Sequence, residues 1–315
     1  MKKHCCNTLL SIIVYSCCMA QAVSAQSGNP DPLAAAANKI TDYFELNYIS
    51  PSGGFDTSGN IDVGDLLYEA QLYTHLNWWN NYKQENDSQH RSILTRLYVP
   101  VKIQLRQYST FSNPVKTPTF NPGLKMYFIP RDFFNTPDDF SYVSFGFHHY
   151  SNGQNGSHID PDTNEVNTEN GSFSSDYVEL SLYSVNDSPI EWMKLNARAY
   201  LTGLTWEEEQ TDYYENFLLE ISGRSKTATI PTGWWLEDIY IQSSLGYKFG
   251  RKYIDHNEDA EFLDNLQFSA EVVARPERWV DMKLFARVDI GYDNYNIYYR
   301  NQTVRLQVGF TGSLF

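Results

Sequence analysis

Residues 280–290 read Val-Asp-Met-Lys-Leu-Phe-Ala-Arg-Val-Asp-Ile, with an apolar side chain at every even position and mostly charged ones between them. This period of two is typical of a β-strand, because successive side chains point to opposite faces. Residues 97–105, 193–201 and 304–314 repeat the pattern, with Lys, Arg, Asn or Gln on the polar face. The runs exceed the five or six residues of an average strand and match the ~9–11 residues of a tilted membrane strand.

Segments of this kind recur along the chain from residue 41 to the end. Twelve are predicted, and an even number is what a closed antiparallel bacterial barrel requires. They cover residues 41–49, 66–78, 93–108, 121–130, 140–151, 175–185, 190–204, 214–224, 236–250, 264–275, 279–292 and 301–315. The sequence therefore predicts an all-β fold, a twelve-stranded antiparallel transmembrane β-barrel that occupies residues 26–315 as one domain. A secreted soluble β-protein is the alternative.

The composition agrees with this fold. The net charge is −14, which argues against a nucleic-acid partner, since phosphate binding needs clustered cations. The mean hydropathy is −0.47, and no apolar run beyond the leader reaches the ~18–20 residues of a membrane helix. A membrane protein without such helices must cross as a closed barrel. Aromatic residues make up 15% of this acidic chain, and such a composition is typical of proteins of the bacterial outer membrane.

Residues 1–25 have the features of a secretory signal peptide. Lys2 and Lys3 start it, an apolar stretch follows, and residues 23–25 (Val-Ser-Ala) form a small-residue cleavage site. All four cysteines lie inside it, so the mature chain would have neither a disulfide nor a thiol nucleophile. A lipoprotein anchored at Cys17 is a second interpretation, although Tyr15 is bulky for such a site.

Loop lengths predict the orientation of the barrel. Residues 186–189 and 276–278 form short turns, which suit the periplasmic side, whereas residues 152–174, 205–213 and 251–263 form longer polar loops. Tryptophans at strand ends are expected to form interfacial girdles. Those on the short-turn side are Trp78, Trp79, Trp192, Trp234, Trp235 and Trp279, with Trp206 at the opposite rim.

The fifth predicted strand, residues 140–151, carries groups that could do chemistry. Its parity puts His149 and Ser151 on the same face as Phe145 and Phe147, which is the lipid face. A polar group in hydrocarbon costs about 1–3 kcal/mol unless it is paired. Residues i and i+2 of a strand are neighbours about 6.5–7 Å apart. An imidazole beside a hydroxyl suggests the base and the nucleophile of a serine hydrolase.

The next predicted strand supplies a third member. Asp176 has the parity of the apolar residues Val178 and Leu180, so it also faces lipid at the outer end, and the intervening loop brings it beside His149. Ser151, His149 and Asp176 are therefore the predicted catalytic triad. Other polar residues have structural interpretations: His148 and Glu179 face the lumen, and the histidines without a comparable partner are His75, His90, His158 and His256.

Residues 146–153, Gly-Phe-His-His-Tyr-Ser-Asn-Gly, match the signature Gly-aromatic-x-His-x-Ser-Asn-Gly, and by it the chain resembles the outer-membrane phospholipases A. Residues 112–122, which begin Ser-Asn-Pro and end Phe-Asn-Pro, are similar to the family's Ser-x-Pro…aromatic-x-Pro stretch. Residues 301–303 lead into the last strand as in the family, and that strand ends on Leu314-Phe315. The resemblance is patchy and runs from about residue 110 to the end.

The resemblance implies a twelve-stranded, calcium-dependent and dimeric phospholipase A1/A2 that hydrolyses acyl esters of phospholipids in the outer leaflet. By it, Ser151 is the nucleophile and His149 the general base. The family orients its histidine with an asparagine, and this chain has Asp176 at the start of the next strand. The family's arginine after Asn-Gly is Gln154 here, whose backbone carbonyl would help to hold Ca²⁺. Asn113 would be a second ligand, contributed across the homodimer.

Two other functions stay open. A lipid A deacylase has the motif His-Tyr-Ser-Asn, found here at residues 149–152, but those barrels are eight-stranded and use a glutamate. A non-enzymatic porin is the other, because the acidic 152–174 loop could constrict a lumen. The loop acids Asp160 and Asp162 are oxygen donors of the type that calcium prefers, although acids in loops are usually only solvated.

Overall fold

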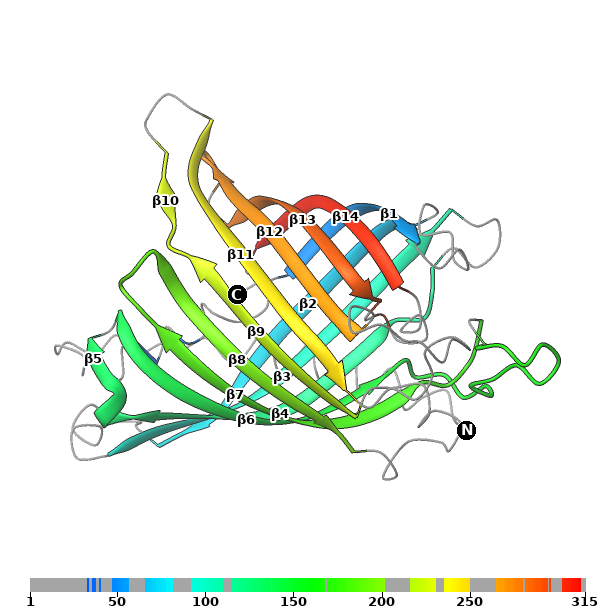
Figure 1. The fold of residues 1–315 in the computed structure, drawn as a ribbon, viewed down its shortest axis with the longest axis horizontal. Coiled ribbons are helices and arrows are strands. Elements are labelled where there is room, and N and C mark those ends of the chain that lie inside the picture. The colour runs from blue at the N-terminus through cyan, green and yellow to red at the C-terminus, as the bar shows by residue number, and fades with distance from the viewer. Residues whose placement is uncertain are drawn as a thin grey trace.

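The chain folds into a closed antiparallel β-barrel, as predicted (Figure 1). The computed structural model describes residues 33, 36–37, 40, 47–56, 66–81, 92–109, 115–136, 138–167, 169–201, 216–230, 235–249, 265–279, 281–293, 295 and 302–312. Within them, twelve long strands each pair with the preceding and the following long strand, and β1 pairs with β14 to close the wall.

The long strands account for almost all the regular structure that is described. They are β1 (Asn47–Asp56), β2 (Leu66–Asn80), β3 (Ile93–Tyr108), β4 (Thr119–Pro130), β6 (Asp139–Ser151), β7 (Ser174–Val185), β8 (Ile190–Tyr200), β9 (Phe217–Ser225), β11 (Leu236–Phe249), β12 (Leu266–Pro276), β13 (Met282–Tyr292) and β14 (Gln302–Gly312). Short strands β5 (Phe134–Thr136) and β10 (Ala228–Thr229) extend the edges of β6 and β11, and a 3₁₀ turn, η3, spans Arg131–Phe133.

The first predicted strand was misplaced. It was expected at residues 41–49, and the structure has it at Asn47–Asp56, after a helical lead-in that includes Ile40. The middle of β1 contains Pro51 and a Gly-Gly pair, residues of low strand propensity that hid the strand from the pattern. The other predicted segments agree with the structure to within a few residues.

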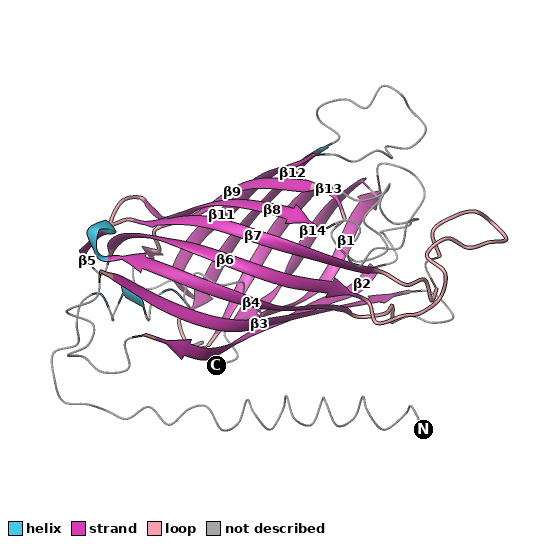
Figure 2. Ribbon diagram, turned by 90° about the horizontal axis from the view of Figure 1, so that it is seen from below, coloured by secondary structure: helices cyan, strands magenta, loops and turns pink. Residues whose placement is uncertain are grey.

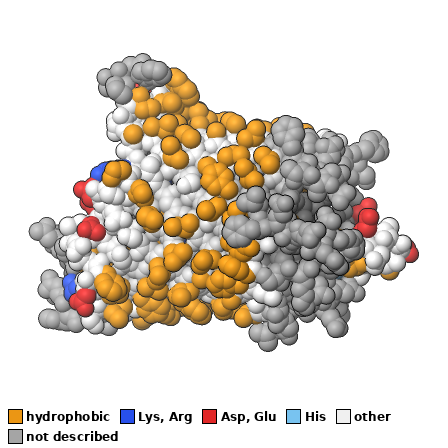
Figure 3. All heavy atoms as spheres, in the orientation of Figure 1, with side chains coloured by type: hydrophobic (Ala, Val, Ile, Leu, Met, Phe, Trp, Pro, Cys, Tyr) orange, Lys and Arg blue, Asp and Glu red, His pale blue; other side chains and the backbone are white. Residues whose placement is uncertain are grey.

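The two faces of the wall differ as the alternation predicts. On β13, Met282 and Ile290 are 49% and 47% exposed on the outside, whereas Phe285 is buried inside. Figure 3 shows hydrophobic side chains spread over the outside of the wall, with the charged ones at its two ends. Such an apolar belt is typical of outer-membrane barrels. Among the described residues, no helix is long and apolar enough to cross a membrane.

The lumen is polar and filled with ion pairs. Glu69 of β2 lies 2.5 Å from Arg106 of β3 and 3.0 Å from Arg305 of β14. Lys125 of β4 lies 2.6 Å from Glu179 of β7. These pairs link strands that are adjacent or two apart along the inner face of the wall, and they leave a cavity of about 380 Å³. Charged residues such as Glu69 and Lys125 can face the inside of the barrel because each is paired there.

The short-turn end of the lumen is closed by apolar packing. Leu33, Ala36, Ala37 and Ile40 of the lead-in are fully buried against aromatic residues of the wall, and Arg96 Nη1 donates a hydrogen bond to Ala37 O at 2.6 Å. Lead-in residues thus pack inside the barrel rather than beside it. The predicted signal peptide, residues 1–25, lies outside the described residues and stays a prediction.

One member of the predicted tryptophan girdle is wrong. Trp78, Trp79, Trp235 and Trp279 are exposed near the short turns, but Trp192 is 5% exposed and packs in the interior cluster. Trp192 has the same parity as Lys194 and Asn196 on the polar face of β8, so plain alternation turns it into the interior despite its position at the strand end. Trp206 and Trp234 lie outside the described residues.

The two ends of the barrel differ as the loop lengths predict. The β7–β8 and β12–β13 connections are short turns at one end. The long β6–β7 loop extends far beyond the wall at the other end (Figure 2).

Candidate active site

His149 and Asp176 lie directly opposite each other on the neighbouring strands β6 and β7. Directly paired residues of antiparallel strands have Cβ atoms about 4.5–5.5 Å apart, close enough for their side chains to meet. His149 Nδ1 is 2.8 Å from Asp176 Oδ1, a hydrogen-bonding distance. The structure therefore brings together the two residues that strand parity placed side by side.

The exposure of this pair is uneven. The side chain of Asp176 is only 9% exposed, whereas that of His149 is 43% exposed. With Nδ1–H donated to the carboxylate, the imidazole keeps Nε2 as its basic nitrogen. A buried carboxylate that fixes the tautomer of a more exposed histidine is the arrangement that prepares a general base.

Ser151 continues the same face of β6 toward the rim, and its register partner on β7 is Ser174. It lies two residues beyond His149, so the two side chains point the same way. Among the described residues, no hydrogen bond joins Ser151 to His149, and the predicted contact between them stays a prediction. In structures without substrate, the distance between a catalytic serine and its histidine is often longer than in the complex with substrate.

The pair stands on an apolar face. Below it, toward the middle of the wall, Phe145, Phe147 and Leu180 are 50%, 43% and 49% exposed on the outside. The next residue along β6, His148, lies on the opposite side and lines the lumen with Tyr177. The polar trio is therefore on the outside of the barrel, at the end of the strands from which the long loop departs.

Asn152 closes the base of that loop directly after Ser151. It is 1% exposed, and its Nδ2 donates to Gly171 O at 2.8 Å. Its Oδ1 accepts the N–H groups of Phe173 at 3.0 Å and Gln154 at 3.2 Å. Sequence reasoning used Asn152 only as part of a motif. The Ser-Asn-Gly order was the available clue, since Asn side chains commonly bond the backbone two residues on.

The remaining histidines have structural surroundings. His158 is fully buried in the β6–β7 loop, with Nδ1 3.2 Å from Ser172 O. His75 packs edge-on against Tyr98 inside the barrel, with ring centroids 5.3 Å apart. His90 and His256 lie outside the described residues.

The predicted calcium ligands are only partly described. Asn113 lies outside the described residues. Gln154 is at the rim, where its Nε2 donates to Thr117 Oγ1 at 3.2 Å, and its backbone carbonyl belongs to the loop base beside Ser151. The described part of the chain holds no group of three or more His, Cys, Asp or Glu that could bind a metal. Asp160 Oδ1 instead accepts the N–H of Asp162 at 2.8 Å, which stabilises the hairpin tip.

Two solved structures share this architecture. Outer membrane phospholipase A from Escherichia coli superposes with a TM-score of 0.58 and 17% identity, over 90% of this chain and 98% of that one. The calcium-bound dimer of the Salmonella typhi outer membrane phospholipase gives a TM-score of 0.56 and 16% identity, over 90% and 97%. No protein-family model and no curated protein sequence matches the chain. The chain thus has the outer-membrane barrel fold of these phospholipases, as its sequence resemblance predicts.

Proposed function

We propose that the protein is a serine acyl hydrolase of the phospholipase A type, which cleaves acyl esters of phospholipids in the outer leaflet of the bacterial outer membrane. The observation that carries the proposal is the His149–Asp176 hydrogen bond on the lipid face, beside Ser151. A histidine and a carboxylate on that face cost free energy, and substrate access explains their place. A serine that faces outward meets ester groups of the bilayer, whereas one in the lumen meets water.

The chemistry follows from the position of each group. His149 Nε2 removes the proton of Ser151 Oγ as that oxygen attacks the ester carbonyl carbon. Asp176 holds the imidazole and stabilises the imidazolium that forms. The imidazolium then returns the proton to the leaving alkoxide, which departs as a lysophospholipid. Water activated by His149 hydrolyses the acyl-enzyme, so that a fatty acid leaves and Ser151 is restored.

Calcium would bind at the rim through neutral oxygen donors, the backbone carbonyl of Gln154 and the side chain of Asn113 from a second copy of the chain. These are donors of the type that Ca²⁺ prefers, but two ligands fall short of the six to eight that it usually takes. Because one of these ligands comes from a second copy, calcium binding would require an active homodimer. Bound calcium supplies positive charge that stabilises the developing oxyanion.

Metal removal tests this part of the proposal. In excess EDTA the purified protein should lose its lipid hydrolysis while keeping its heat-resistant barrel, and added Ca²⁺ should restore the activity. An unchanged rate in EDTA would remove calcium from the mechanism.

The two alternative functions fit less well. Twelve long strands, counted within the described residues, differ from the eight of a lipid A deacylase. Arg106 of β3 is 2.8 Å from Asp293, which follows β13 four strands away around the wall, so an ion pair spans part of the interior where a porin needs an open passage.

The decisive experiment measures the release of fatty acid and lysophospholipid from phospholipid in mixed micelles. Ser151→Ala should abolish the release. Ser174→Ala is the matched control, because it removes the hydroxyl directly opposite on β7 and should leave most of the activity. Activity that survives Ser151→Ala but not Ser174→Ala would mean that the nucleophile is wrong. An inactive wild type under all lipid and calcium conditions would overturn the proposed function.

A further inference from the structure

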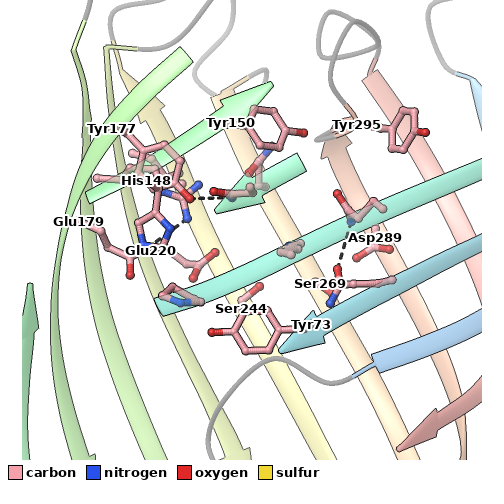
Figure 4. Close-up of a pocket in the computed structure, with 18 of the residues that line it drawn as sticks. Tyr73, His148, Tyr150, Tyr177, Glu179, Glu220, Ser244, Ser269, Asp289 and Tyr295 are labelled. Atoms are coloured by element: carbon pink, nitrogen blue, oxygen red, sulfur yellow. Dashed lines mark hydrogen bonds and ion pairs between the residues drawn. The ribbon is translucent and has the colours of Figure 1, made fainter. Parts of the chain in front are cut away.

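The outer His149–Asp176 pair has an aromatic pair directly behind it. His148 and Tyr177, the adjacent register partners on β6 and β7, point into the lumen, and Figure 4 shows both side chains in the cavity. Their rings stack with centroids 4.9 Å apart and an interplanar angle of 11°. Each strand therefore carries one member of the outer pair and, next to it in sequence, one member of the inner stack.

Two glycines make room for the imidazole of His148. Gly123 is its register partner on β4, and a Cβ built there would overlap His148 Nδ1. Gly146 is two residues earlier on β6, and its Cβ would lie 2.9 Å from His148 Nε2. Real Cβ atoms essentially never come that close to another heavy atom, so a larger residue at either position must displace the ring. The ring of His148 is thus seated against the backbone of the wall.

Tyr177 is fixed as well. Its hydroxyl accepts a hydrogen bond from Asn121 Nδ2 at 2.9 Å. The guanidinium of Arg198 lies over its ring, 4.4 Å from the centroid, and Arg198 Nη2 is 3.2 Å from Glu179 Oε2. A cation over an aromatic face is attracted by the ring quadrupole. The inner stack is therefore bonded to β4 and β8 on either side of the two strands that carry the site.

We propose that His148 and Tyr177 are positioning residues, whose stack on the inner face holds β6 and β7 in the register and orientation that the outer His149–Asp176 hydrogen bond requires. This inference rests on the proposed function of the outer pair. Consecutive side chains of a strand leave one backbone in opposite directions, so fixing one ring fixes the direction in which the next side chain leaves. On the outside, the 43% exposed imidazole of His149 has little packing of its own.

Positioning predicts an effect on turnover rather than on binding. Misplacing a catalytic group by about 1 Å can cost about 100-fold in rate. His148→Ala should therefore lower kcat by about 10–100-fold with little change in KM, while His148→Phe, which keeps a flat ring, should recover most of kcat. Ser244→Ala is the control, because Ser244 lines the same cavity on the more distant strand β11.

A second route to the same displacement avoids removing the ring. Gly123→Ala should lower kcat as His148→Ala does, since the new methyl group displaces the imidazole and also crowds the backbone carbonyl of Phe147 on β6, at 2.9 Å. Gly246→Ala is the matched strand control, because the nearest atom to its Cβ would be the flexible end of Leu218 at 3.3 Å, and its other neighbours would lie at ordinary contact distances of 3.6 and 3.8 Å. Equal kcat values for Gly123→Ala and Gly246→Ala would contradict the proposal.

The deciding measurement does not need activity. NMR of the folded barrel in detergent, with ¹⁵N-labelled histidine, detects a hydrogen-bonded imidazole N–H that disappears in His149→Ala and in Asp176→Ala. We expect His148→Ala to lose or broaden this resonance and His148→Phe to keep it. A resonance and a kcat both unchanged in His148→Ala would overturn the inference. If the wild type fails to hydrolyse lipid, the proposed function fails, and the resonance still decides whether the inner stack positions the outer pair.

Discussion

Two charged groups of the same barrel wall are placed in opposite ways. On the inside, Glu69 is 1% exposed and accepts hydrogen bonds from Arg106, Arg305 and Gln307. On the outside, Asp176 faces the single imidazole of His149, which is 43% exposed and stands on an apolar surface. The inner carboxylate shares its charge with partners on two other strands, whereas the outer carboxylate holds one side chain from one neighbouring strand.

The difference between the two carboxylates distinguishes a group that stabilises the fold from a group that serves a site. A buried charge is tolerated when it is paired and fully hydrogen-bonded, and breaking such a cluster leaves an uncompensated charge. The Glu69 cluster therefore serves the barrel. The outer pair contributes little to the stability of the fold, because the side chain of His149 is 43% exposed. It nevertheless places polar groups on a face where hydrocarbon is expected. A costly group that contributes little to folding indicates a site.

The largest expected effect comes from the outer pair and concerns activity alone. His149→Ala should reduce lipid hydrolysis by about 1,000-fold or more, because the general base is lost. The free energy of unfolding should change by less than about 1 kcal/mol, as is usual for an exposed side chain. Hydrolysis assays and urea unfolding in detergent measure the two quantities. A variant that lost both together would place His149 with the structural groups.

The inner cluster should show the reverse. Glu69→Gln should lower the free energy of unfolding by about 3–5 kcal/mol, because Arg106 and Arg305 both lose the buried carboxylate of Glu69. The activity of each folded molecule should persist, since Glu69 is on β2, away from β6 and β7.

The control for Glu69→Gln is a neutral contact on the same strands. Gln104 Nε2 donates to Gln71 Oε1 at 3.1 Å, and Gln104→Ala should cost only about 1 kcal/mol. Equal losses of stability for the two variants would mean that the charge of Glu69 is unimportant.

A smaller effect is expected from the charge of Asp176. Asp176→Asn keeps an oxygen that can accept the imidazole N–H but loses the charge, and charge-assisted hydrogen bonds are about twice as strong as neutral ones. Activity should fall by about tenfold, a difference of about 1.4 kcal/mol in the barrier. Asp176→Ala should fall much further, toward the level of His149→Ala. If both substitutions gave the same loss, the carboxylate would be acting by more than orientation.

The period-two alternation of the sequence limits how much of the fold and of the site could be predicted. Parity assigns each side chain to a face, so it placed His149 and Asp176 outside and His148 inside. The register that puts Asp176 beside His149 also puts Tyr177 beside His148, but parity carries no information on ring orientation, so the stacking of the two rings could not be predicted. The pattern fails where Pro and Gly interrupt it, as in β1. The girdle prediction for Trp192 failed for another reason, because it relied on the position at a strand end and not on the inward parity that Trp192 shares with Lys194.

A third charged pair lies in water and should give the smallest effect. Asp187 in the β7–β8 turn is hydrogen-bonded to Lys226, and the side chains are 70% and 59% exposed. The ammonium group of Lys226 holds the pKa of Asp187 below its ordinary value. The pair therefore stabilises the fold above the unfolded pKa of about 3.9, and this contribution is lost as the pH falls through the lower pKa of the folded state.

Asp187→Asn tests whether ion pairing alone distinguishes the three groups. Exposed pairs contribute little, because water and salt screen them. At pH 7 Asp187→Asn should lower the melting temperature by no more than about 1–2 °C and leave the lipid hydrolysis unchanged. This small difference in melting temperature should disappear as the pH falls below about 4 and Asp187 of the wild type becomes protonated. A clear loss of stability at pH 7 would mean that a solvated pair matters as much as a buried one. The comparison would then rest on pairing and not on surroundings. We expect the surroundings to decide the role of each charged group. In water the Asp187 pair contributes little to stability, in the lumen the Glu69 cluster stabilises the barrel, and on the lipid face the His149 pair is available for chemistry.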